Sequence, residues 1–147
     1  MAHVRKQIRE AVKTKVTGLT TTGSNVFETR IYNLKPSNLP ALLVSTPDET
    51  SFVGTFPTPR PLERIVEINL DAFAKGTANL EDTLDLISEE VETALMTDIT
   101  LGGLTKDLFL KSTKSDLSGE GKQPIGIVKM VFECRYMTTE TTPGTAI

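Results

Sequence analysis

The sequence predicts an α+β fold in which a mostly antiparallel sheet is covered on one face by two helices. Apolar residues recur at helical spacing in two segments and alternate along several others. The predicted elements follow the order α-β-β-β-α-β-β, without the regular β-α alternation of a parallel sheet. The chain has 147 residues, which is enough for a single domain with one core.

Two amphipathic helices are predicted. Between residues 3 and 17, Val4, Ile8 and Val12 recur at helical spacing among basic side chains, and Gly18 can adopt a left-handed helix-ending conformation. Residues 80–96 form the second helix, for which Asn79 suits the N-cap position. Its apolar stripe comprises Leu80, Leu84, Ile87, Val91 and Leu95.

Five segments have the alternation or the β-branched and aromatic content of strands. They span residues 26–32, 39–44, 63–74, 108–115 and 125–136. In the third of them, alternation predicts a buried face made by Val66, Ile68, Leu70 and Ala72. In the first, Phe27, Thr29 and Ile31 share one face, and Val26, Glu28, Arg30 and Tyr32 share the other.

The remaining segments are predicted to be connections. Residues 46–61 contain four prolines and read as one long loop, which is uncommon in a compact domain unless it is functional or disordered. Residues 116–124 are polar and rich in glycine, as in a long hairpin connection. Residues 137–147 have no core-forming pattern, so we expect a domain at 1–136 and a flexible C-terminal tail at 137–147.

The composition argues against several functional classes. The net charge of −3 lacks the basic excess of a typical DNA-binding protein. The only histidine, His3, is expected in a frayed N-terminus, and the only cysteine, Cys134, is expected in the core. The Gly119–Lys122 segment lacks the first glycine and the hydroxyl residue of a phosphate-binding loop. We therefore predict no enzyme, no catalytic, cofactor-binding or metal-binding residues, no cofactor, no signal peptide and no membrane helix.

A larger pattern lies between Val4 and Glu49, where VRKQIREAV is followed by TTGSNVFETRIY and then by LPALLVSTPDE. Together with the strand from Glu63 to Ala74, which ends in Asp-Ala-Phe-Ala, it resembles the tail terminator proteins of long-tailed bacteriophages (siphoviruses). These proteins are also called tail completion or minor tail U-like proteins. The resemblance covers most of the chain.

The resemblance implies a structural protein that assembles into a hexameric ring. Such a ring caps the head-proximal end of the tail tube, stops tube polymerisation and provides the surface for head–tail joining. The implied partners are further copies of the chain, the tail tube protein and a head connector or neck protein. DNA would pass through the lumen without sequence-specific binding. The implied location is the virion tail, after synthesis in the host cytoplasm and without a membrane.

The ring hypothesis leads to two sets of candidate contact residues. We expect a subunit interface between Arg30 and Tyr32 on one copy and the 46–61 segment on the next, including an Arg30–Asp48 or Arg30–Glu49 ion pair. The interface set is Arg30, Tyr32, Asp48, Glu49, Phe52 and Phe56. The hairpin set, expected to contact the tail tube or the connector, is Ser118, Gly119, Glu120, Gly121 and Lys122.

Other functions fit the same composition. The chain could be a different neck or head–tail connector protein, or a dimeric adaptor domain with no phage connection. A small enzyme or ligand-binding domain would need a pocket with convergent polar groups, and the sequence offers no such set.

Overall fold

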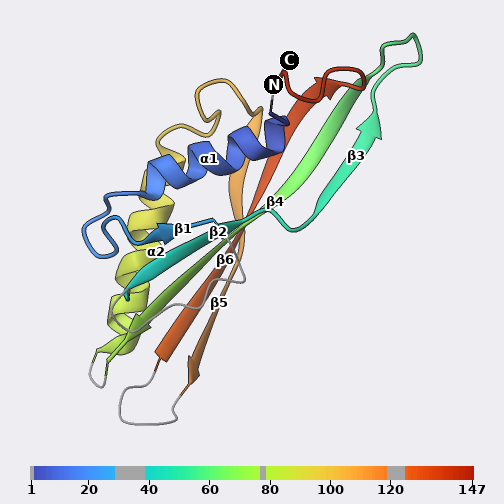
Figure 1. The fold of residues 1–147 in the computed structure, drawn as a ribbon. Coiled ribbons are helices and arrows are strands. Elements are labelled where there is room, and N and C mark those ends of the chain that lie inside the picture. Colours follow the sequence, from blue (N-terminus) through green and yellow to red (C-terminus); the bar gives the residue numbers. More distant parts are fainter. Residues whose placement is uncertain (1, 29–38, 77–78, 119–124) are drawn as a thin grey trace.

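The computed structural model describes residues 2–28, 39–76, 79–118 and 125–147. It contains two helices and a six-stranded, mostly antiparallel sheet, so the predicted α+β class is confirmed (Figure 1). The helices are α1 (Val4–Val16) and α2 (Leu80–Met96). The strands are β1 (Val26–Phe27), β2 (Ala41–Ser45), β3 (Glu49–Val53), β4 (Pro61–Lys75), β5 (Asp107–Ser118) and β6 (Ile125–Thr139).

The long strand β4 organises the sheet. One of its edges pairs with β6 over the whole length of both strands, and β6 pairs in turn with β5. The other edge of β4 is shared by two short strands. β2 pairs with residues 69–73, and β3 pairs with residues 62–66. All these pairs are antiparallel, whereas β1 adds to β2 in parallel.

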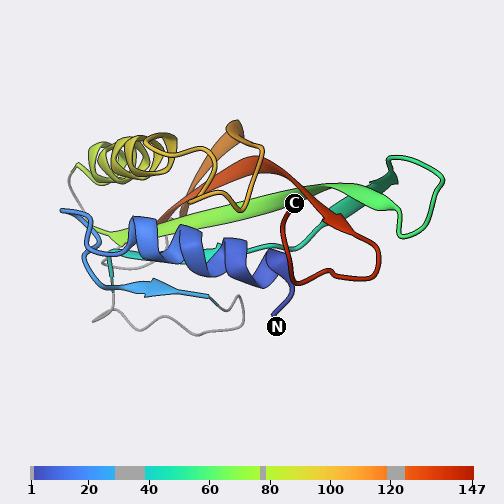
Figure 2. The same ribbon diagram turned by 90° about the horizontal axis from the view of Figure 1, so that it is seen from above.

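Both helices pack on the same face of the sheet and enclose one core (Figure 2). Alternate residues of β4 point into this core, and the predicted buried set from Val66 to Ala72 is fully buried, because successive strand residues face opposite sides. Each helix contributes one residue per turn. These residues are Val4, Ile8, Val12 and Val16 of α1, and Leu84, Ile87, Val91 and Leu95 of α2.

The prediction of one long loop over residues 46–61 is wrong. Residues 49–53 form β3, and residues 54–60 connect it to β4 as a hairpin. Thr50, Phe52 and Val53 favour strands and all four prolines fall outside β3, and β4 offers this segment an unpaired edge beyond β2. The β3–β4 hairpin extends beyond the helices and forms one end of the molecule (Figures 1 and 2).

Three local predictions differ from the structure in whole or in part. His3 is the N-cap of α1 rather than a frayed residue, because its Nδ1 accepts a hydrogen bond from the Arg5 N–H at 3.0 Å. Asn79 occupies the N-cap position of α2, as predicted, but its backbone is left-handed (φ 59°) and its side chain makes no capping hydrogen bond. Val26 is buried in the core, so the strand face that we expected to meet a neighbour begins with a core residue.

The C-terminal segment lies against the start of α1. β6 continues to Thr139, three residues beyond the predicted end of the domain. The Val4 N–H then donates to the carbonyl of Pro143 at 2.9 Å, and the Ile147 N–H donates to the carbonyl of Met137 at 2.9 Å. The two chain ends are therefore close together (Figure 1). The expected flexibility of residues 137–147 stays a prediction.

Candidate interaction surface

The most exposed apolar residues of the hairpin lie at its outer end. We call β3, the 54–60 connection and residues 61–66 of β4 the arm. Every residue from Ser51 to Pro59 is exposed, and the exposed fractions of Phe52 and Phe56 are 52% and 89%. Clustered exposed apolar side chains indicate an interaction site in a soluble protein. The two phenylalanines predicted at the subunit interface are thus accessible, although the interface itself stays a prediction.

A cluster of polar side chains holds the base of the arm. The side chain of Glu49 is only 10% exposed, and its Oε2 accepts hydrogen bonds from Arg5 NH1 at 2.7 Å and from Arg64 NH1 at 3.3 Å. The Tyr136 hydroxyl donates to Glu49 Oε1. Arg64 also donates through Nε to Thr138 Oγ1 at 3.0 Å. The cluster thereby connects α1, β3, β4 and β6.

The cluster changes the acid–base properties of its members. Burial, followed by the hydrogen bond to Glu49, raises the pKa of the Tyr136 hydroxyl well above its ordinary range. Burial and the charges of Arg5 and Arg64 lower the pKa of His3, which favours the neutral imidazole. The Arg5 guanidinium, the buried carboxylate and the neutral ring fit one another without a bound ligand, so the cluster acts as a structural clasp.

The clasp bears on the predicted interface pair. Both carboxylate oxygens of Glu49 have partners within the same chain, so this residue has no physical need of a partner from a neighbour. Asp48, in contrast, has an exposed side chain at the bend between β2 and β3. Arg30 and Tyr32 lie outside the described residues. An Arg30–Asp48 contact between copies therefore stays a prediction, and Glu49 is the weaker alternative.

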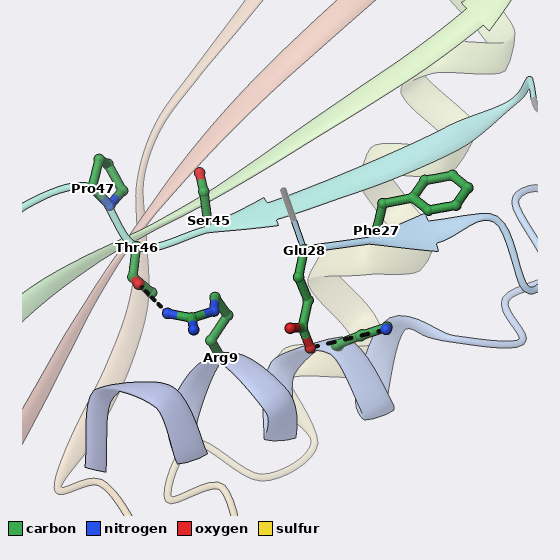
Figure 3. A pocket seen from close by; sticks show the side chains of 7 residues that line it. Arg9, Phe27, Glu28, Ser45, Thr46 and Pro47 are labelled. Carbon is green, nitrogen blue, oxygen red and sulfur yellow. Dashed lines mark hydrogen bonds and ion pairs between the residues drawn. The ribbon is translucent and has the colours of Figure 1, made fainter. Parts of the chain in front are cut away.

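A hollow of about 580 Å³ lies between α1 and the β1–β2 edge (Figure 3). Its two cations are held within the chain: Arg9 NH1 donates to Thr46 Oγ1 at 3.0 Å, and Lys13 Nζ lies 3.9 Å from Glu28 Oε1. The other lining residues are Phe27, Ser45 and Pro47. These contacts tether α1 to the sheet edge, and none of the seven lining residues forms a nucleophile–base pair.

A second hollow, which we call the end hollow, lies between α2 and the Gly18–Thr20 turn and measures about 430 Å³. Its apolar lining includes Leu19, Leu86 and Ala94, and the exposed fraction of Leu86 is 48%. Sequence reasoning missed this site. The sequence feature that could have revealed it is Leu86, a leucine that lies outside the apolar stripe of the second helix.

The hairpin set is only partly described. Ser118 is the last residue of β5, and Gly119, Glu120, Gly121 and Lys122 lie outside the described residues. The flanking Leu117 and Ile125 are exposed. The expected contact of this hairpin with a tail tube or connector stays a prediction.

Two searches of the described part of the chain had negative results. No group of three or more His, Cys, Asp or Glu side chains there is placed to hold a metal ion. In the same part, neither helix is long and apolar enough to cross a membrane. Cys134 is buried in the core, as expected, and burial raises its pKa to about 12.

Comparisons with known proteins show a distant structural similarity. The chain matches no protein-family model and no curated protein. It is similar to a chain of a solved structure, the virion of a native gene transfer agent (GTA) particle. The TM-score is 0.42 and the sequence identity is 12%, with 92% of each chain covered. We draw no functional conclusion from a similarity of this strength.

Proposed function

We propose that the chain is a structural virion protein of the tail terminator type. A ring of six copies caps the head-proximal end of a phage tail tube, stops its polymerisation and provides the surface for head–tail joining. The exposed Phe52 and Phe56 on the arm are the observation that carries this proposal. Its specific form comes from the sequence resemblance over Val4–Glu49 and Glu63–Ala74.

The arm has the properties of one half of a subunit contact. Aromatic residues are enriched in interface cores. The free energy of the system falls when a partner covers a phenylalanine that was exposed to water. The clasp around Glu49 anchors the arm to α1 through Arg5 and to β6 through Tyr136. An anchored arm loses less conformational entropy on binding than a free loop would.

The net charge suits the same function. The charge of −3 disfavours tight binding to phosphates, so DNA could slide through a lumen formed by six copies. Ser118 and Ile125 lie at the end of the sheet opposite the arm, and we expect the segment between them to contact the tail tube or the connector. Deleting residues 118–122 should then abolish capping and leave the fold intact.

The test has two stages, of which the first is the mass in solution by light scattering over a wide concentration range. A species of six times the chain mass of 16.1 kDa supports the ring. A stable two-fold dimer contradicts it and favours the adaptor alternative.

The second stage is the length distribution of tail tubes assembled with the intact chain or with the 118–122 deletion, measured by electron microscopy. The intact chain should stop tube growth and the deletion should not. Tubes that keep growing with the intact chain would contradict a terminator function. Tubes of normal length with the deletion would contradict the function of the hairpin alone.

A further inference from the structure

We propose that the arm of one copy docks into the end hollow of the next copy, with the ring of Phe56 inserted between α2 and the Gly18–Thr20 turn. This inference rests on the ring proposed above and assigns its two contact surfaces. The partner is a second copy of this chain, bound head to tail.

The positions of the two surfaces favour a head-to-tail contact. The arm forms one end of the molecule, and α2 with the turn after α1 forms the other, in both views (Figures 1 and 2). Two different patches at opposite ends cannot satisfy each other within one chain. When copies associate through such patches, the contact is heterologous, and it generates a ring if the rotation closes.

The sizes and the chemistry of the two surfaces match. Phe56 is the most exposed large apolar side chain among the described residues, at 89%. The end hollow of about 430 Å³ can take an aromatic side chain, and Leu19, Leu86 and Ala94 give it an apolar lining. Insertion would remove both Phe56 and the half-exposed Leu86 from water, which is favourable for each.

The polar groups of the hollow tolerate this insertion. The carboxylate of Glu90 already accepts hydrogen bonds from the Thr21 N–H at 2.9 Å and from the Thr21 hydroxyl at 2.7 Å. An apolar side chain docked beside it therefore leaves the Glu90 carboxylate with its partners. Residues 50–62 of the arm contain no acidic side chain, so the arm does not repel Glu89 and Glu90 of the hollow.

The experiment is disulfide trapping with two single variants, Phe56→Cys and Leu86→Cys. The native Cys134 is buried, so it does not compete for cross-linking. Under mild oxidation, a mixture of the two variants should give a cross-linked dimer, and the double variant should give a ladder of species up to six copies. The matched control replaces Leu86→Cys with Leu117→Cys, because Leu117 has a similar exposed fraction, 45%, but lies on β5.

The outcomes separate this contact from the proposed function. A six-copy species with no Phe56→Cys to Leu86→Cys cross-link would overturn the contact and leave the ring standing. A ladder that extends beyond six copies into filaments would support the contact and overturn the closed ring. Cross-linking of Phe56→Cys with itself, or equal cross-linking to Leu117→Cys, would overturn the head-to-tail docking.

A further variant tests how much Phe56 contributes to the affinity between copies. Phe56→Ser should raise the concentration at which half of the chains are assembled by about tenfold or more, since burial of a phenylalanine drives the contact. Its urea unfolding midpoint should equal that of the unmodified chain, because the side chain is exposed in the single copy. Unchanged assembly of Phe56→Ser would overturn the proposal even if the Phe56→Cys to Leu86→Cys cross-link formed.

Discussion

The guanidinium of Arg5 donates a hydrogen bond of 2.7 Å to the carboxylate of Glu49, and this contact joins the first turn of α1 to the first residue of β3. Arg64 on β4 and Tyr136 on β6 donate hydrogen bonds to the same carboxylate. The arm is therefore held at its base by charge, while its outer end is left free to bind.

We expect Glu49→Gln to lower the free energy of unfolding by about 2 kcal/mol. The side chain of Arg64 is only 11% exposed, and it would lose the negative charge that compensates its burial. Urea unfolding followed by circular dichroism measures the change. Asp48→Asn is the matched control, since the Asp48 side chain is exposed, and it should change stability by less than about 0.5 kcal/mol. Equal unfolding midpoints for both variants would contradict a structural clasp.

Stability should decrease at alkaline pH because of Cys134. Burial raises its pKa from the ordinary 9.0 to about 12, so above pH 9 the unfolded chain releases a proton that the folded chain retains. The contribution of the buried, protonated thiol to stability is complete below pH 9 and is lost as pH rises toward 12. The free energy of unfolding should fall by up to about 1.4 kcal/mol per pH unit over this range. Urea unfolding at pH 8, 9 and 10 measures this slope.

The control for the alkaline prediction is Cys134→Ala, which removes the thiol. Tyr136, whose pKa is also raised, adds a similar decrease only above the ordinary tyrosine range. The variant should therefore show a flatter profile between pH 9 and 10. A profile as steep as that of the unmodified chain would assign the loss to other groups.

Gly126→Ala should destabilise the packing of α2 on β6 by about 1–3 kcal/mol. An added methyl group at this position would lie 2.6 Å from Leu84 Cδ1 and 3.0 Å from Leu117 Cδ2. Thermal or urea unfolding measures the loss. In the double variant with Leu84→Ala, the shortened side chain makes room for the methyl group, so the cost should be smaller than the sum of the two single costs. If the losses of stability of the two single variants simply add in the double variant, the methyl group at position 126 does not press against Leu84.

The predicted flexibility of residues 137–147 can be tested by hydrogen exchange. Ile147 and Val4 donate backbone hydrogen bonds that connect this segment to β6 and to α1. Hydrogen exchange measured by NMR should show faster exchange for these two amides than for those of the β4–β6 pairs if residues 137–147 are flexible. Protection equal to that of the β4–β6 amides would show instead that the segment is a fixed part of the domain.

Several elements followed directly from the residue pattern. The second helix occupies residues 80–96, as its apolar stripe predicted, and the long strand β4 buries the face that its alternation predicted. Phe52 and Phe56, which the sequence placed in the expected interface set, are exposed. These features depend on neighbours in the sequence, so a local pattern is enough to reveal them.

Other elements could not be found in this way. β3 is an edge strand with exposed side chains, so it has no apolar alternation, and it forms only because β4 offers an unpaired edge beyond β2. The clasp and the end hollow each combine segments that are far apart in the sequence. The partners of Glu49, for example, lie 44 and 87 positions away in Arg5 and Tyr136.

The sequence by itself determined the class of the fold, its long helix and the inner face of its central strand, because hydrophobic periodicity is a property of neighbouring residues. Only the tertiary structure decided which charges are paired, where the arm begins and which leucine remains half exposed beside the hollow. Those outcomes depend on the distances between remote segments, and such distances are established only when the sheet forms and the helices pack on it.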